Sequence, residues 1–307
     1  MIKIYYKKTT IMFSLFLISL LLFNYANSNK NTIVEVSNHD DTDIQASMQN
    51  TVTDISKKNK IIISPEQKNQ WDMYHYRSNS LSIDIEPIVK INPNIKYWIT
   101  HVKINSPNQL KTTFGHDNFM AEREKTSEIT SRNQGILGIN ASAFFFDTNK
   151  PSGIIIQKGK ILAEGYGTPL CIKRDGTFYI PTSGKTGKEL IQQGVKHTFT
   201  FGPILINNGE KIPITFGSPN GSYPRTAIGQ VSINEYYIIT ADGKRPGYSI
   251  GLTTQELQDL LFDRGATIAY NLDGGGSTTL YFNGRLVNSP SDETGERSVA
   301  NIIYFTK

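Results

Sequence analysis

The stretch Asn271-Leu272-Asp273-Gly274-Gly275-Gly276-Ser277-Thr278-Thr279 places a carboxylate beside three consecutive glycines, directly after an apolar segment that predicts a strand. Glycines adopt positive φ easily, so such a turn can direct several backbone N–H groups at one anion. Asn271 and Asp273 are two residues apart, and in extended chain their side chains face the same side. The stretch therefore predicts an acid next to an anion-binding turn formed by Gly274, Gly275, Gly276 and Ser277.

The residues after the glycines exclude the best-known glycine-rich loops. Dinucleotide- and phosphate-binding loops require a helix at this point, and the phosphate loop also requires Gly-Lys followed by Ser or Thr. Residues 278–287 instead predict a β-hairpin that turns at Asn283-Gly284. A serine nucleophile elbow centred on Ser277 would need glycine where the chain has Thr279. A glycine-rich bulge in which Asp273 only caps the turn is the remaining structural alternative.

Composition indicates a globular protein without a charge signal for nucleic acid. The 307 residues are 38% apolar and 10% aromatic, which is enough for a buried core. The formal net charge is +5, but three of the lysines, Lys3, Lys7 and Lys8, lie in a predicted export signal, and without them it is +2. Cys171 is the single cysteine, so no internal disulfide can form.

The N-terminal quarter of the chain predicts export followed by a tether. A positive region ends at Lys8, an apolar run extends from Ile11 to Phe23, and Ala26-Asn27-Ser28 supplies small residues for cleavage. The apolar run is short for a membrane span, so residues 1–28 are predicted to be a signal peptide, with an uncleaved anchor as the alternative. Residues 29–77 are polar and predict a flexible tether. The expected location is secreted or cell-surface, with membrane contact only through an uncleaved signal.

Residues 78–307 are expected to form one α+β domain of mixed, mainly antiparallel β-sheet with a few helices. One helix is predicted from 118 to 133 and another from 254 to about 264, the latter with Thr253 and Glu256 spaced as a capping box and Gly265 as its stop. Alternating segments and Gly-containing turns predict strands or hairpins at 81–85, 97–104, 154–162, 170–180, 267–272, 278–287 and 299–305.

Further polar side chains fall at junctions between predicted strands and loops: Asn140, Arg225, Asp242, Glu296 and Arg297. Two arginines and two asparagines near one glycine turn would suit a phosphate group. Phe144-Phe145-Phe146 follows Asn140, and this aromatic run either stacks on a sugar ring or, as is commoner for three phenylalanines, belongs to the core.

Together these segments resemble the phosphodiester glycosidase family over residues 78 to 307. The resemblance is most specific in the glycine turn and its downstream segments, and it is carried by residues 271–279, 288–291, 296–301, 138–146, 224–229, 242–243 and 251–253. Ala141 and Ser142 stand where many relatives have glycine. The resemblance implies an exported hydrolase that cleaves the glycosidic bond of a sugar 1-phosphodiester in a cell-surface or extracellular glycan.

The family chemistry implies a role for each candidate residue. The leaving group of a sugar 1-phosphodiester is already an anionic phosphate ester, so protonation of the leaving oxygen matters less than in an ordinary glycoside. Asp273 would be the nucleophile or the base that activates water, with Asp242 or Glu296 as a second carboxylate. The remaining candidates would hold the substrate: Arg225, Arg297 and the glycine amides the phosphate, and Asn140 and Asn271 the sugar or the phosphate.

Two other classes of function stay open from the sequence. The same residues would serve a non-catalytic module that binds anionic glycans, or an exopolysaccharide or cell-wall assembly factor with transferase activity. The expected partner in each case is a glycan or sugar phosphodiester and not nucleic acid. No cofactor is expected, and no zinc site is predicted because His/Cys ligand spacing is lacking. Asp242 and Asp273 offer hard oxygen ligands, so metal binding stays open as the weaker alternative.

Overall fold

A computed structural model describes residues 70–215 and 220–307. The predicted signal peptide and the predicted tether up to residue 69 lie outside the described residues. Regular structure begins with β1 (Gln70–Trp71) and β2 (His75–Arg77), ahead of the domain start predicted at residue 78. These two short strands pair with each other and continue into the main sheet, so residues 70–77 belong with the folded domain.

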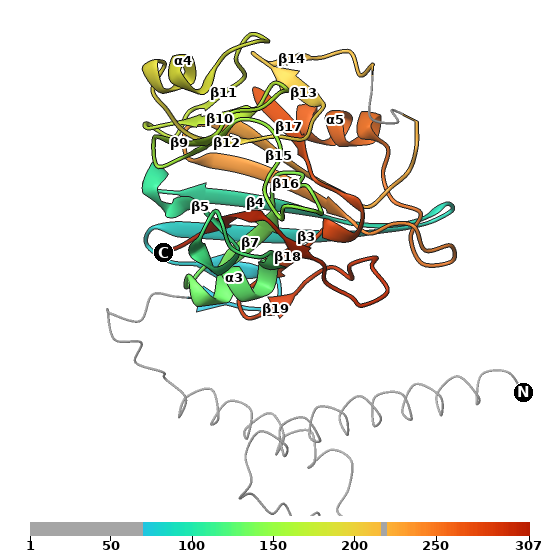
Figure 1. Cartoon of the computed structure of the whole chain (residues 1–307). Coiled ribbons are helices and arrows are strands. Elements are labelled where there is room, and N and C mark those ends of the chain that lie inside the picture. The colour runs from blue at the N-terminus through green and yellow to red at the C-terminus, as the bar shows by residue number, and fades with distance from the viewer. Residues whose placement is uncertain (1–69, 216–219) are drawn as a thin grey trace, which may run out of the picture. The chain divides into compact units, whose positions relative to one another are not determined.

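A nine-stranded sheet forms the centre of the fold (Figure 1), in the order β1-β2-β3-β4-β16-β15-β17-β13-β14. After β1 and β2, the strands of this sheet are β3 (Leu81–Ile91), β4 (Asn94–Ile104), β16 (Glu235–Ala241), β15 (Arg225–Ser232), β17 (Ile268–Leu272), β13 (Ile204–Asn207) and β14 (Glu210–Lys211). Every described pairing in it is antiparallel. The predicted α+β fold with mainly antiparallel sheet is confirmed.

A five-stranded antiparallel sheet packs against the central sheet. Its strands, in order, are β19 (Arg285–Leu286), β18 (Leu280–Phe282), β7 (Leu137–Asn140), β21 (Asn301–Phe305) and β5 (Leu110–Phe114). Alternate residues of both sheets point inward, so Ile83 and Val102 of one sheet share a fully buried core with Ile139, Phe282 and Phe305 of the other. Burial of this apolar surface is the main force that holds the two layers together.

Short strands and 3-10 helices lie outside the two large sheets. The strands are β6 (Glu124–Lys125), β20 (Ser298–Val299), β8 (Ile155–Gln157), β9 (Lys160–Ala163), β10 (Leu170–Lys173), β11 (Phe178–Tyr179) and β12 (Val195–Phe199). The short 3-10 helices are η1 (Pro107–Gln109), η2 (Gly115–Asp117) and η3 (Gly275–Ser277). Leu170 of β10 and Phe199 of β12 extend the core between the two large sheets.

Helices cover the outer faces of both sheets (Figure 1). On the central sheet, α5 (Thr254–Phe262) buries Leu257 and Leu261 against Ala269 of β17. On the five-stranded sheet, α3 (Thr126–Arg132) buries Ile129 against Ile302. A third helix, α4 (Gly187–Gln192), packs beside β12. None of these helices, within residues 70–215 and 220–307, has the length and apolar character of a membrane span.

The prediction for α5 is confirmed in its cap as well as its length. The Thr253 hydroxyl accepts from Glu256 N at 3.1 Å, and the Glu256 carboxylate accepts from Thr253 N at 2.8 Å. The hairpins predicted within 154–162, 170–180 and 278–287 are also confirmed, and they turn at Lys158-Gly159, Asp175-Gly176 and Asn283-Gly284.

The helix predicted over 118–133 is wrong in its first half, because α3 begins only at Thr126. Glu124 lies in β6, which pairs with β20 across Val299, and its buried carboxylate binds Arg132 and His116 N. These tertiary contacts hold the chain extended just before the helix. The sequence analysis also missed α4, although Thr186 and Glu189 form a capping box there.

Candidate active site

Strand register brings three of the predicted site residues to one end of the central sheet. Arg225, which begins β15, pairs with Ala241 at the end of β16, and the next residue, Thr226, pairs with Leu272 at the end of β17. In an antiparallel sheet one strand begins where its neighbours end, so Asp242 and Asp273 leave their strands on either side of Arg225. Residues far apart in sequence thus meet at one sheet edge.

The asparagine at the end of β7 joins the second sheet to this edge. Asn140 is fully buried, and its Nδ2 donates to the Asp273 carbonyl oxygen at 2.5 Å. Its Oδ1 accepts from the Thr226 hydroxyl at 2.7 Å and from Thr279 N at 3.1 Å. Both polar atoms of the side chain thus bond within the protein, and through Nδ2 Asn140 positions the Asp273 backbone; the sugar or phosphate contact expected from the sequence stays a prediction.

Asn271 has a similar internal position. Its side chain is fully buried, and Nδ2 donates to the Gly202 carbonyl oxygen at 2.7 Å. The backbone of Asn271 is bonded to the same loop, through Gly202 N at 3.0 Å and the Pro203 carbonyl oxygen at 3.1 Å. Asn271 therefore ties the end of β17 to the segment before β13 and holds the strand that delivers Asp273.

The glycine turn needs glycine at its centre for two different reasons. Gly275 has φ of 61°, in the left-handed region that favours glycine, and a Cβ there would meet no other atom within 4 Å. Gly276 is instead packed against an ion pair, because a Cβ there would overlap Asp292 Oδ1 and Arg297 Nη2. The turn is thus shaped to bring backbone and charged side chains into direct contact.

The backbone amides of the turn are largely used inside it. Gly275 N donates to the Pro224 carbonyl oxygen at 3.0 Å, and Ser277 N and Thr278 N donate to carbonyl oxygens of the turn at 3.2 Å. The sequence analysis expected the whole turn to offer its N–H groups to an anion. Three amides of the turn therefore already have protein acceptors.

The carboxyl of Asp273 has a pKa well above its ordinary value. The residue is partly exposed, and desolvation raises the pKa of its carboxyl from 3.8 to about 6, opposed by the Ser277 hydroxyl, the Gly274 amide and Arg297. A carboxyl that titrates near neutrality at the surface of a sheet edge has the properties of an acid–base group or nucleophile.

Asp242, predicted as a second catalytic carboxylate, is instead enclosed by hydrogen-bond donors. Its exposure is 1%, and it accepts from the Tyr248 hydroxyl at 2.8 Å, Asn288 Nδ2 at 3.0 Å and Ser289 N at 3.1 Å. Arg245 lies 3.6 Å away. Burial raises the pKa of Asp242, while Tyr248 and Asn288 oppose the rise. These contacts assign Asp242 to holding the loop at 288–289.

Glu296, the other predicted second carboxylate, caps a helix. Its two carboxylate oxygens accept from Ser127 N at 2.8 Å and from Ser127 Oγ at 2.6 Å, in the first turn of α3. Burial raises the pKa of Glu296, and both bonds from Ser127 oppose that rise. A carboxylate in this position also interacts favourably with the positive end of the helix dipole.

We expect Glu296→Ala to act on stability rather than on turnover. Loss of a helix-capping carboxylate should lower the free energy of unfolding by about 1–2 kcal/mol, measured by urea titration. Glu128→Ala removes an exposed glutamate from the same turn of α3, and as the control it should cost less than about 1 kcal/mol. A fall in kcat of two orders of magnitude with unchanged stability would return Glu296 to the catalytic set.

Arg297 and Asp292 form an ion pair against the glycine turn. Arg297 Nε and Nη2 each donate to one carboxylate oxygen of Asp292 at 2.6 Å, a bidentate arrangement that fixes both planes. Both side chains contact Gly276, and the charge of Arg297 acts on Asp273. The sequence analysis predicted Arg297 but missed Asp292, because a carboxylate in a polar loop is usually solvated and only tertiary packing brings this one to the turn.

Arg225 is buried at the start of its strand. Its Nε donates to the Leu252 carbonyl oxygen at 3.3 Å and Nη2 to the Gly221 carbonyl oxygen at 3.2 Å, and the guanidinium lies 5.3 Å from the centre of the Tyr223 ring. Burial lowers its pKa, although an arginine remains charged. The charged group is thus held by the backbone of residues 221 and 252 next to the Tyr223 ring.

The phenylalanine run is divided between core and surface: Phe144 packs, partly buried, against the cluster that contains Ile129, while the next two residues are exposed, contrary to the commoner expectation. Phe145 and Phe146 are 55% and 66% exposed. The Arg123 guanidinium lies 4.6 Å from the centre of the Phe144 ring and 4.8 Å from that of Phe146, and Arg297 lies 5.8 Å from Phe146. Exposed aromatic faces next to guanidinium groups therefore border the site on this side.

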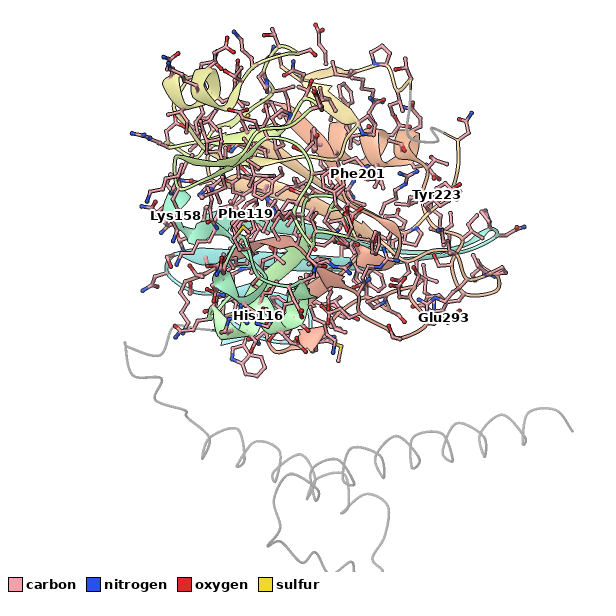
Figure 2. The ribbon with its side chains drawn as sticks, viewed as in Figure 1. His116, Phe119, Lys158, Phe201, Tyr223 and Glu293 are labelled. Carbon is pink, nitrogen blue, oxygen red and sulfur yellow. The ribbon has the colours of Figure 1, made fainter. Side chains whose placement is uncertain are left out.

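Two further exposed aromatic side chains lie just before β13 and β15. Tyr223 and Phe201 are 37% and 43% exposed, and Figure 2 shows Tyr223 towards the right edge of the domain with Phe201 to its left. Aromatic side chains of this kind suit the apolar faces of sugar rings. Within the described residues, no group of three or more His, Cys, Asp or Glu is arranged to hold a metal ion.

Comparison with known proteins gives one family. The family model described as phosphodiester glycosidase matches residues 133–306, a range that includes every predicted site residue. Among curated proteins, the chain is 31% identical over 194 residues to the SPbeta prophage-derived uncharacterized protein YomE of Bacillus subtilis, covering 60% of this chain and 30% of that protein. It is 28% identical over 192 residues to N-acetylglucosamine-1-phosphodiester alpha-N-acetylglucosaminidase of Mus musculus, covering 56% and 36%. The chain thus spans about a third of the length of these curated relatives.

Solved structures share the fold. The catalytic domain of zebrafish N-acetylglucosamine-1-phosphodiester alpha-N-acetylglucosaminidase, auto-inhibited by its pro-peptide, superposes with a TM-score of 0.63 at 18% identity, over 78% of this chain and 88% of that one. A hypothetical protein from Synechocystis superposes with a TM-score of 0.56 at 15% identity, over 75% and 63%. At these sequence identities the superpositions show a shared fold and nothing further.

Proposed function

This chain belongs to the phosphodiester glycosidase family, and we propose on that premise that it hydrolyses the glycosidic bond of a sugar 1-phosphodiester. The family membership expected from the glycine turn and its flanking segments is thereby confirmed. The observation that supports the activity is the position of Asp273, a carboxyl with a pKa of about 6 at the end of the central sheet, where the charge of Arg297 acts on it.

The proposed chemistry assigns the attacking role to Asp273. Its ionised carboxylate either attacks the anomeric carbon or removes a proton from the water that does so. The glycosidic bond then breaks toward the phosphate oxygen, and the leaving phosphate monoester keeps the electron pair. Arg225 and Arg297 would stabilise the charge that develops on that phosphate.

Asp292 takes the place of Asp242 and Glu296 as the proposed second carboxylate. It lies against Gly276, while Asp242 and Glu296 are enclosed by donors elsewhere. Its bidentate bond orients Arg297 toward the turn. This arrangement suits a substrate whose leaving group carries its own negative charge, because the second carboxylate can then position a cation instead of donating a proton.

The proposed substrate is an exported or surface-attached glycan that contains sugar phosphodiester links. The predicted signal peptide supports a secreted or cell-surface location, and the exposed Phe145 and Phe146 support contact with sugar rings. An anionic-glycan-binding module and a transferase in exopolysaccharide or cell-wall assembly are the competing functions, and both would use the same surface.

The proposal is tested with the purified protein from residue 29 onward and a panel of sugar 1-phosphodiesters, with the aryl glycosides of the same sugars as controls. We expect release of free sugar from at least one phosphodiester, with kcat/KM higher than for its aryl glycoside. Binding without release from any substrate would favour the binding module. Transfer of the sugar to an added glycan acceptor in preference to water would favour the transferase.

A further inference from the structure

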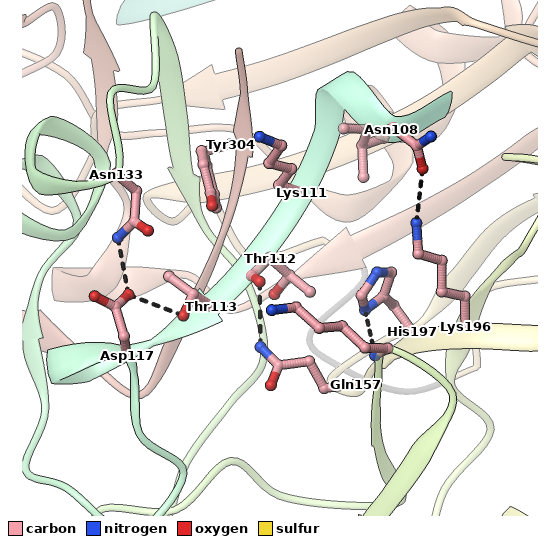
Figure 3. Close-up of a pocket in the computed structure, with 12 residues that line it drawn as sticks. Asn108, Lys111, Thr112, Thr113, Asp117, Asn133, Gln157, Lys196, His197 and Tyr304 are labelled. Atoms are coloured by element: carbon pink, nitrogen blue, oxygen red, sulfur yellow. Dashed lines mark hydrogen bonds between the residues drawn. The ribbon is translucent and has the colours of Figure 1, made fainter. Parts of the chain in front are cut away.

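A groove of about 480 Å³ lies along β5, the edge strand of the five-stranded sheet (Figure 3). One wall is β5 with the adjoining η1, and the other is the turn between β8 and β9 together with β12. Gln157 Nε2 donates to the Thr112 carbonyl oxygen at 3.2 Å and links the two walls. Because the groove shares no lining residue with the site around Asp273, it requires an explanation of its own.

The groove carries an excess of positive charge. Three lysines line it: Lys111, Lys158 and Lys196. None of the carboxylates in residues 70–215 and 220–307 forms an ion pair with them, since the hydrogen bond of Lys196 Nζ, at 3.2 Å, goes to the neutral Asn108 Oδ1. Like charges that share a groove repel one another, so an anion bound between them is favoured.

The carboxylate in the groove does not neutralise these lysines. Asp117 lies at the far end, where it accepts from Arg132 Nε at 2.9 Å, the Thr113 hydroxyl at 3.0 Å and Asn133 Nδ2 at 2.8 Å (Figure 3). Hydrogen bonds from these donors lower the pKa of Asp117, although desolvation opposes them. Arg132 is shared between Asp117 and Glu124, so this end of the groove keeps one unmatched negative charge, and the three lysines still give the groove a positive excess.

His197 provides a neutral donor at the base of the groove. Its side chain is 4% exposed, and Nδ1 accepts from Lys158 N at 3.4 Å, so the ring proton resides on Nε2. Burial, together with Lys196 and Lys158, lowers the pKa of His197 to about 3, and the ring stays neutral at physiological pH. The groove thus combines ammonium groups with hydroxyl, amide and imidazole N–H groups, a donor set for an acidic sugar.

We propose that this groove binds the acidic groups of an anionic glycan at a second site, separate from Asp273. Figure 2 shows Lys158, on the groove side, and Tyr223, next to Arg225, at opposite sides of the domain. The second site does not depend on hydrolysis, but it deepens the proposed function if one polymer reaches both sites. Such a polymer would be held near the catalytic carboxylate by an increased effective concentration.

Binding is measured by fluorescence polarisation with a fluorescein-labelled heparin hexasaccharide, at about 0.15 M salt, where distant charges are largely screened. Labelled maltohexaose is the neutral probe of the same length. The groove variant replaces Lys111, Lys158 and Lys196 by glutamine. The matched control replaces three exposed lysines away from the groove, Lys90, Lys103 and Lys188, so that both variants lose the same net charge.

We expect the groove variant to bind the heparin hexasaccharide at least about 10-fold more weakly than the unmutated protein does, and the control variant less than about 3-fold more weakly. Maltohexaose should bind to neither variant. Both variants should cleave a small sugar 1-phosphodiester as the unmutated protein does.

Equal weakening in both variants, or absence of heparin binding by the unmutated protein, would overturn the second site. Loss of small-substrate cleavage in the folded groove variant alone would show that the groove is not separate from the active site. If no phosphodiester is cleaved by any protein but the binding difference persists, the proposed hydrolysis fails and the groove stands.

Discussion

Asp273→Asn is expected to lower kcat on a sugar 1-phosphodiester by about 10²-fold or more while making the folded protein more stable at neutral pH. Asparagine keeps the size of the side chain but has no charge, so it can neither attack the anomeric carbon nor accept a proton from water. The backbone of residue 273 stays anchored through its bonds to Asn140 and Ala141, and the turn should keep its shape.

The stability gain follows from the direction of the pKa shift. The folded-state pKa of Asp273 is about 6, above its ordinary value of 3.8, so folding disfavours the ionised form. The destabilisation is absent below about pH 4 and complete above about pH 6, where it amounts to roughly 3 kcal/mol at most. We therefore expect Asp273→Asn to raise the free energy of unfolding at pH 7.5 and to leave it unchanged at pH 3.5, as measured by urea titration.

The same carboxyl should set the pH dependence of the reaction. Because the ionised form is the proposed nucleophile or base, kcat/KM should rise with pH through about 6 and then level off. Asp147→Asn, which alters an exposed carboxylate after the phenylalanine run, is the control and should change neither kcat nor the profile. A folded Asp273→Asn protein with near-normal turnover would move the catalytic role to Asp292.

Gly276→Ala is expected to lower kcat by at least about 10-fold, because a methyl group there occupies the space of the Asp292–Arg297 ion pair. To make room, Arg297 must leave the position in which its charge acts on Asp273. Overpacking of this kind usually also costs about 1–3 kcal/mol of stability. Steady-state kinetics and urea titration on the same preparation measure both effects.

Gly275→Ala is the matched control for that substitution. Its φ of 61° makes alanine unfavourable by about 1 kcal/mol or slightly more, but the added methyl group meets no atom within 4 Å. Turnover should therefore stay within a few-fold of that of the unmutated protein. If both variants lost turnover equally, the flexibility of the turn would matter and the ion pair would not.

Local patterns were sufficient wherever a few neighbouring residues decide the outcome. The capping box at Thr253 and Glu256 predicted α5, and Asn283-Gly284 predicted a hairpin, because both signals act within four residues. The helix expected over 118–133 failed where the decisive contacts are distant. Val299 pairs with Glu124 from far along the chain and keeps that segment extended.

The identity of the candidate site was readable in part from the same local patterns. Asp273 and the glycine turn stand together in sequence, and Arg225 begins an apolar strand whose register could not be predicted. Local sequence does not distinguish carboxylates that reach the turn from those that are enclosed. Asp242 and Glu296 share the residue type of Asp292, but their surroundings of hydrogen-bond donors come from other elements.

The sequence by itself determined the family, the antiparallel α+β fold and the turn that carries Asp273, because motifs and periodicity are properties of neighbouring residues. Only the tertiary structure decided which polar groups surround that turn. Asn140 became an internal brace and Asp292 a partner of Arg297 because β7 and the loop before β20 end at the glycine turn. Burial and charge at a site depend on such long-range packing, and so does the raised pKa of Asp273.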